Sequence, residues 1–317
     1  MLRCKNKIIS RVGFFLFSAF LLTLFGYGWY WNMLAEKFID TIVGWAEARG
    51  AEGYEINYES IETGGFPFFL HVKITYPKLS IFNKKQSWNW RGPTLRLSTR
   101  PWRIEKIEVS ASGRHLAKFT TQHGTRDLDI EAGNLRIFLE WAAMSALPVV
   151  VQGELKDASY RYAPVLGLGR ATKIIGFRAD LKGAPLRSIN AIALEQWRKQ
   201  GGALQIKNLS IHHGPLKVEG EGSLAINENL QPLAAFNLKV RGYIEAVDRL
   251  QSSKLIKPID ARLMKTVLSM MAGGKGYDVK DKGENWINIP LSIQEGYFYV
   301  GPLSLGRVPT IHWSALN

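Results

Sequence analysis

The chain has 317 residues, of which 46% are hydrophobic, so it can bury a sizeable core and is not a disordered tail. Its 41 Lys and Arg exceed its 27 Asp and Glu, which gives a formal net charge of +14. A basic surface of this size suits nucleic acid or anionic lipid headgroups, or serves solubility alone. The single cysteine, Cys4, lies in the basic N-terminal leader, which excludes disulfides in the rest of the chain.

The first predicted element is a membrane-spanning helix over residues 12–31. This stretch has 20 residues and no charge, and at about 1.5 Å per residue it covers roughly the 30 Å hydrocarbon core of a bilayer. A cleaved signal peptide is the alternative, but bulky aromatic residues stand where it would have a small-x-small site. We therefore expect a retained anchor, with these candidate anchor residues: Val12, Phe14, Leu16, Leu21, Leu24, Trp29, Tyr30 and Trp31.

The charge on either side of this helix predicts its orientation. Arg3, Lys5, Lys7 and Arg11 precede it with no acidic residue, whereas acidic residues outnumber basic ones over 32–51. Since positive flanks stay inside, the N-terminus is predicted to be cytoplasmic. In a bacterium the chain is then a single-pass inner-membrane protein with its main domain in the periplasm. We expect a cytoplasmic leader at 1–11, a signal anchor at 12–31, a juxtamembrane amphipathic helix at 32–53 and a β-rich exported domain at 54–317.

The juxtamembrane helix is predicted from apolar residues at helical spacing. Leu34, Phe38, Ile42 and Trp45 recur every three or four residues, and glycines at 50 and 53 end the segment. This stripe either packs on the exported domain or lies along the membrane surface, and we favour packing because amphipathic helices usually serve a core.

Beyond residue 54 the apolar residues alternate, which predicts strands. The clearest blocks are 70–75, 106–110, 204–206, 216–218, 236–240 and 291–293. Helical patterns interrupt them at 188–200, where Ser188 can cap, at 243–250, and from Pro258 to the glycines at 273 and 274. The expected fold class is α+β, mainly antiparallel β, with an elongated curved domain and a few amphipathic helices. The two-lobe alternative has its seam near 183–202.

Glycine and proline mark the turns of this domain. Gly65, Phe66, Pro67 and Phe68 are predicted to form a turn that shapes a hairpin, because Gly and Pro set backbone geometry. Gly-Pro also precedes alternating residues in three places, at 92–97, 214–218 and 301–305, and proline can open a strand. Gly214, Pro215, Gly301 and Pro302 are therefore structural candidates, and a degenerate internal duplication stays an open alternative.

Catalytic, cofactor-binding and metal-binding motifs are not found. The six histidines form no H-E-x-x-H or similar ligand set. Asp127, Asp129 and Glu131 share one strand face and suit a cation or paired carboxylates, but a solvated polar face explains them as well. Trp88, Trp90 and Trp102 lie near arginines, as in base-stacking proteins, yet a sheet core or a bilayer interface fits better. We expect no nucleic acid partner.

Four short blocks occur in order along the chain: 64–68 (GGFPF), 88–93 (WNWRGP), 201–204 with 214–216, and 301–303 with 306–309. Together they resemble the bacterial family called domain of unknown function 2125 (DUF2125). This family is similar in style to AsmA-like envelope proteins, whose strands carry Leu-x-x-x-Gly-x-Leu; residues 216–224 resemble that pattern, with the sequence Leu-x-x-x-Gly-x-Gly-x-Leu. The resemblance implies an alphaproteobacterial inner-membrane protein and points distantly to lipid handling. It assigns no catalytic residue, and fold analogy alone does not carry function.

Three functional hypotheses follow. The leading one is a non-enzymatic envelope protein whose apolar sheet face binds membrane lipid or an envelope protein. A hydrolase acting on glycan or lipid through Asp127 and Asp129 is the second, and a structural scaffold of a membrane complex is the third.

Overall fold

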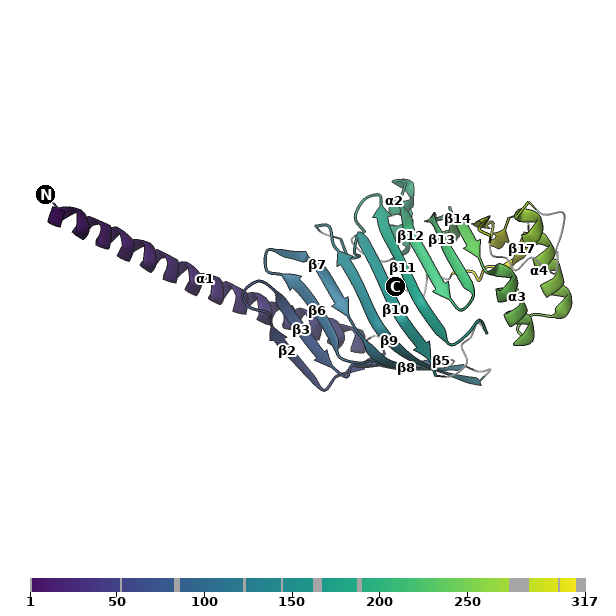
Figure 1. Cartoon of the computed structure of the whole chain (residues 1–317), viewed down its shortest axis with the longest axis horizontal. Coiled ribbons are helices and arrows are strands. Elements are labelled where there is room, and N and C mark those ends of the chain that lie inside the picture. Colours follow the sequence, from purple (N-terminus) through teal and green to yellow (C-terminus); the bar gives the residue numbers. More distant parts are fainter. Residues whose placement is uncertain are drawn as a thin grey trace.

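The computed structural model describes residues 2–51, 53–82, 86–121, 124–143, 145–161, 167–186, 190–273, 285–301 and 303–311. A long N-terminal helix leads into a large antiparallel sheet, and three shorter helices accompany the sheet in the described part of the chain (Figure 1). The predicted class, α+β and mainly antiparallel β, is confirmed.

The helices are α1 (Leu2–Ala51), α2 (Ala191–Lys199), α3 (Tyr243–Ser252) and α4 (Pro258–Met271). The strands are β1 (Tyr54–Asn57), β2 (Ser60–Gly64), β3 (Leu70–Thr75), β4 (Lys78–Phe82), β5 (Gln86–Arg91), β6 (Leu95–Arg100), β7 (Arg103–Ser110), β8 (Gly113–Thr121), β9 (Gly124–Glu140), β10 (Val150–Tyr160), β11 (Ala171–Lys182), β12 (Ala203–His213), β13 (Leu216–Ile226), β14 (Pro232–Arg241), β15 (Ile287–Gln294), β16 (Tyr297–Val300) and β17 (Leu303–Arg307).

Helix α1 is continuous through the predicted spanning and juxtamembrane segments. It has 50 residues, and at about 1.5 Å per residue it is roughly 75 Å long. Its part from Phe14 to Gly50 is long and apolar enough to cross a membrane. Gly53, with φ +89°, follows its end, as the glycine pattern predicted. The side chain of Val12 lies outside those described.

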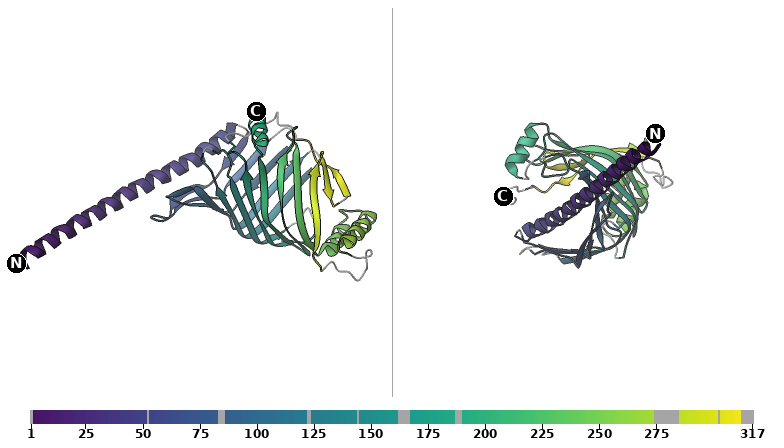
Figure 2. Two further views of the ribbon diagram at one scale, coloured as in Figure 1. Left: turned by 90° about the horizontal axis from the view of Figure 1, so that it is seen from above. Right: turned by 90° about the vertical axis from the view of Figure 1, so that its left-hand side faces the viewer.

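Strand β9 is the point at which the sheet branches. Its first half pairs with β8 and its second half pairs with β7, while β10 runs along its other edge. Two arms therefore start from β9, one ordered β8–β5–β4–β1 and the other β7–β6–β3–β2. From β10 to β17 the strands pair in chain order, and the sheet curls around the long axis of the molecule (Figure 2).

Helix α1 packs against both arms, through β1 and β3. Trp31, Leu34 and Ala35 are buried with Leu70, which is 0% exposed, and Phe38 lies beside them. The Trp31 Nε1 atom donates a hydrogen bond to the Phe69 carbonyl at 2.9 Å. The expected packing of the juxtamembrane stripe is thus confirmed for Leu34 and Phe38. Trp45, further along the stripe, is 53% exposed.

The three shorter helices cover the two ends of the long strands. Helix α2 buries Leu194 and Trp197 against Leu186, and α3 buries Tyr243 and Ile244 against β14 and β15. The expected cap, Ser188, lies outside the described residues, and the Asn190 side chain caps α2 by accepting from the Ala193 amide at 2.8 Å. Strands β11 and β12, which precede and follow α2 in the chain, pair with each other. The sheet is therefore continuous across the connection at 183–202.

The molecule is open compared with a compact domain of its mass. It exposes 21059 Å² of surface, whereas a compact monomer of 35.7 kDa exposes about 13,000 Å². The difference comes from an exposed apolar helix and from a sheet that no second sheet covers in the described part of the chain. Large apolar surfaces are therefore left for other contacts.

Candidate functional site

One row of paired residues crosses nine strands of the sheet and is apolar throughout. In order from β7 to β16 it contains Ile107, Leu139, Val151, Ala179, Ile206, Gly222, Phe236, Leu291 and Val300. Directly paired residues point to the same side of a sheet. We call this side the apolar face.

The neighbouring row points to the opposite side and is mostly polar. It contains Lys106, Glu140, Val150, Asp180, Gln205, Ser223, Ala235, Ser292 and Tyr299. Ion pairs occupy this side, for example between Lys106 and Glu140 at 2.9 Å and between Lys207 and Asp180 at 2.9 Å. The sheet thus has one apolar and one polar face, which is the pattern of a sheet with water on one side only.

A row of irregular residues keeps the apolar face continuous across β9, β10 and β11. Asp157 has φ +52°, and the pairings on either side of it place Gly133 and Lys173 next to it on the adjacent strands. Beyond this row the buried positions along each strand shift by one residue, and Ala132 and Ala158 are buried there. One extra residue in a strand reverses the side to which the following side chains point. Because β9, β10 and β11 each have one at the same level, their apolar side chains stay on one common face.

The helices cover the apolar face only at its ends. Helix α1 covers it at β3, α2 covers it near Leu181 and Ile226, and α3 and α4 cover it at β13 to β15. All members of the apolar row except buried Ala179 are half-buried, and Val300 packs against the cluster under α3 and α4. They are neither enclosed in a core nor fully open to water, and this stretch has the size and character of a contact surface.

Two phenylalanine rings on this face lie against glycines of the adjacent strands. A Cβ atom on Gly153 would lie 2.6 Å from the Phe177 ring, and one on Gly222 would lie 2.2 Å from the Phe236 ring. Glycine is therefore required at both positions for the rings to cover the strand beside them.

This arrangement predicts that Gly222→Ala destabilises the protein by about 1–3 kcal/mol, because the added methyl group would lie 2.2 Å from the Phe236 ring and 2.5 Å from the Ala235 carbonyl oxygen. Gly176→Ala is the matched control in the same sheet, since its Cβ would meet only the Gly153 carbonyl at 3.9 Å. We expect that control to lie within about 0.5 kcal/mol of wild type. Chemical unfolding of the full chain in detergent measures both, and equal losses would contradict the ring placement.

A small polar cluster interrupts the apolar face beside α3. Tyr160 Oη lies 3.0 Å from Thr172 Oγ1, which lies 2.7 Å from His213 Nδ1. Burial, followed by the nearby Arg249 guanidinium, lowers the pKa of His213, so its ring is neutral at pH 7. The sequence patterns test histidines only as metal ligands, and they do not connect His213 with Tyr160 and Thr172, because the three residues come from three different strands.

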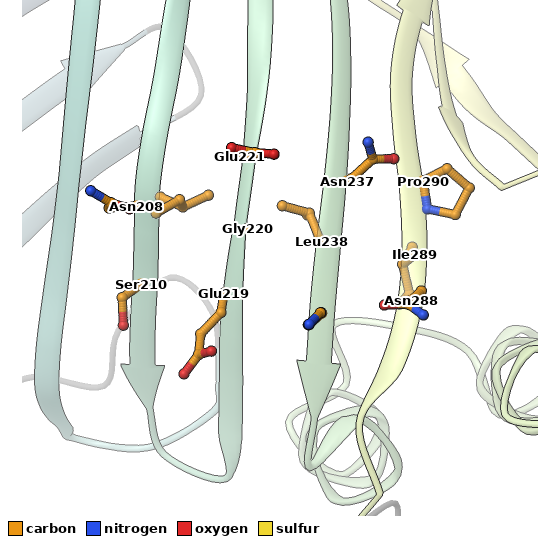
Figure 3. A pocket seen from close by; sticks show the side chains of 12 residues that line it. Asn208, Ser210, Glu219, Gly220, Glu221, Asn237, Leu238, Asn288, Ile289 and Pro290 are labelled. Carbon is orange, nitrogen blue, oxygen red and sulfur yellow. The ribbon is translucent and has the colours of Figure 1, made fainter.

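The polar face carries a hollow of about 810 Å³ over β12 to β15. Figure 3 shows Glu219 and Glu221 of β13 in it, with Ser210 on one side and Asn237 on the other. These groups offer hydrogen bonds from neighbouring strands on a surface open to solvent. Among the described residues no three His, Cys, Asp or Glu side chains are grouped so as to hold a metal ion.

Asp129, a residue of the candidate carboxylate pair, is held by an arginine. Its side chain is 6% exposed and accepts two hydrogen bonds from Arg114, at 2.9 and 2.7 Å. Arg114 holds the pKa of Asp129 below its usual value. A carboxylate fixed in its ionised form by such a fork is a structural ion pair and a poor general acid. Asp127, on the same strand, is exposed.

We predict that Arg114→Met destabilises the protein by about 2–3 kcal/mol at pH 7, because it leaves a buried carboxylate with poor compensation. Since the folded pKa of Asp129 is lowered, the stabilisation is present above pH 3.8 and is lost as the pH falls through the folded pKa. The difference between variant and wild type should therefore shrink in acid. Lys118→Met, at an exposed position of β8, is the control, and a pH-independent difference would contradict the ion-pair account.

The structural candidates lie in connections between strands. Gly65 has φ +99° in the β2–β3 loop, where a Cβ would lie 2.8 Å from the Phe69 carbonyl oxygen. Gly214 and Pro215 turn β12 into β13, and Gly301 follows β16, while Pro302 lies outside the described residues. Gly92 and Pro93 instead connect β5 to β6, in different arms. The Gly-Pro segments thus occupy unlike places in the topology.

The anchor candidates divide into an exposed and a packed group. Phe14, Leu16, Leu21, Leu24 and Trp29 are 46–73% exposed, and Tyr30 is 38% exposed. Trp31 is 7% exposed because it packs on the sheet domain. Trp88 and Trp90 are half-buried in β5, between β4 and β8, and Trp102 is 56% exposed.

Fold and site together define a class: an antiparallel β-sheet protein with one long apolar N-terminal helix and one apolar sheet face. The model of a bacterial family, described as "Uncharacterized protein conserved in bacteria (DUF2125)", matches residues 31–149 and 117–309. The chain belongs to this family, and the resemblance seen in its Gly-Pro and Gly-Gly blocks is confirmed. No curated protein and no solved structure matches the chain.

Proposed function

We propose that this chain is a single-pass inner-membrane protein whose periplasmic sheet binds lipid acyl chains on its apolar face, in a non-enzymatic envelope role. The apolar row across nine strands carries the proposal. A half-buried apolar row suits unbranched hydrocarbon chains, which need contact area and few polar partners.

The position of α1 supports lipid over another ligand. One continuous helix joins the predicted membrane span to the start of the apolar face, at Trp31, Leu34 and Leu70. The apolar face thus begins where the predicted anchor leaves the bilayer, and an acyl chain has a short path onto it. The basic leader before residue 12 favours a cytoplasmic N-terminus and hence a periplasmic sheet.

Native mass spectrometry of the full chain, extracted in mild detergent, tests the proposal. We expect the protein ion to carry one or more phospholipid masses that survive a delipidating wash. A bare protein that also fails to sediment with liposomes would overturn the lipid proposal. Co-purification of a second envelope protein without lipid would instead favour a partner-binding or scaffold role.

A further inference from the structure

The β2–β3 loop and the β6–β7 turn expose aromatic side chains. Phe66 is 54%, Phe68 is 65% and Phe69 is 42% exposed in the loop, and Trp102 is 56% exposed in the turn. Exposed apolar patches of this kind are unfavourable in water and mark contact with a protein or a membrane. Phenylalanine and tryptophan are also the side chains that membrane surfaces accept readily.

Hydrogen bonds attach both connections to the C-terminal end of the predicted span. Tyr27 Oη donates to the Pro67 carbonyl, and Tyr30 Oη donates to the Pro101 carbonyl at 3.0 Å. Tyr27 precedes Trp31 by four residues, or about 6 Å of helix. If residues 12–31 span the hydrocarbon core, the Phe66–Phe69 loop lies at the level of the headgroups around the helix.

Several backbone groups of the loop have hydrogen-bond partners. The Gly65 carbonyl accepts from the Phe69 amide at 2.9 Å, the Phe69 carbonyl accepts from Trp31, and Pro67 has no N–H to satisfy. Paired backbone groups are what a segment needs where water is scarce. Arg100 and Arg103 are exposed beside the turn, and the Arg100 guanidinium lies 5.8 Å from the centre of the Phe69 ring. Their charge suits anionic headgroups.

We propose that the Phe66–Phe69 loop and Trp102 insert into the periplasmic headgroup region of the bilayer and form a second membrane contact beside the anchor. Two contacts fix the orientation of the sheet on the membrane, which a single helix does not. The inference rests on the anchoring part of the proposed function and is independent of lipid binding by the apolar face.

Site-directed spin labelling of the full chain tests this contact, because Cys4 is the only native cysteine. In a Cys4→Ser background, nitroxides are placed at Phe68→Cys and at Trp102→Cys. Leu21→Cys serves as the anchor reference, and Ile259→Cys, 74% exposed on α4 at the far end of the sheet, is the aqueous reference (Figure 1). The protein is reconstituted in vesicles of phosphatidylethanolamine and phosphatidylglycerol, and label accessibility to oxygen and to a nickel chelate is measured.

We expect the oxygen-to-nickel accessibility ratio at 68 and 102 to exceed that at 259 and to lie below that at 21, as for labels at headgroup depth. Ratios at 68 and 102 equal to the ratio at 259, with residue 21 in the bilayer, would overturn the second contact alone. An aqueous label at 21 would overturn the anchoring itself. More than half of the Phe68 and Trp102 surface is exposed, so both variants should fold, and an unchanged unfolding midpoint checks this.

Discussion

Val151→Glu is expected to remove most of the lipid that the full chain retains, at least about tenfold, because a carboxylate that an acyl chain would cover and remove from water costs several kcal/mol. Val151 lies in the apolar row between Leu139 and Ala179, away from the helices. A charge there lies in the middle of the proposed contact surface. Native mass spectrometry, with the fraction of lipid-bound ions as the readout, measures the effect.

Gln152→Glu is the matched control for this variant. It introduces the same charge on the same strand, one residue further along, where the side chain is exposed on the polar face next to Arg178. We expect wild-type lipid retention from it. Equal losses in both variants, or retention in both with unchanged unfolding midpoints, would contradict acyl-chain binding on the apolar face.

Leu34→Asp is expected to destabilise the sheet domain by about 3–5 kcal/mol, since it buries a carboxylate without a partner. Leu34 packs with Trp31 and Leu70 where α1 contacts β3. Thermal unfolding in detergent and hydrogen exchange of the β3 amides report the loss.

Met33→Asp adds the same charge one residue earlier, on the 44% exposed side of the helix. That variant should stay within about 0.5 kcal/mol of wild type. If Leu34→Asp unfolds no more easily than Met33→Asp, α1 does not support the sheet and the continuous path from anchor to apolar face is wrong.

Local sequence patterns predicted the helices and several strands of this fold, but not β8, β10 and β11. Alternation placed strands at 70–75 and 236–240, and helical spacing with Pro258 placed α4. These features depend on neighbours in the chain, which is why a single sequence reveals them. The cap of α2 was placed too early, at Ser188, because several residues before that helix are able to cap it and only the backbone decides that Asn190 does.

The branching of the sheet and the continuity of the apolar face were not predictable. Branching requires β9 to exchange one partner strand for another along its length, and no local pattern records that. Gly133 was a visible sign of irregularity, but Asp157 and Lys173 resemble ordinary strand residues. The alignment of these three residues across β9, β10 and β11 arises only from strand register.

Photo-crosslinking with phospholipids that carry a diazirine in the acyl chain tests the central claim most directly. After irradiation of the full chain in vesicles, peptide mapping should find acyl adducts on β10 to β12, at residues such as Val151 and Ile206, in addition to the anchor segment. Adducts confined to residues 12–31 would contradict the account, because the apolar face would then bind no acyl chain from the membrane.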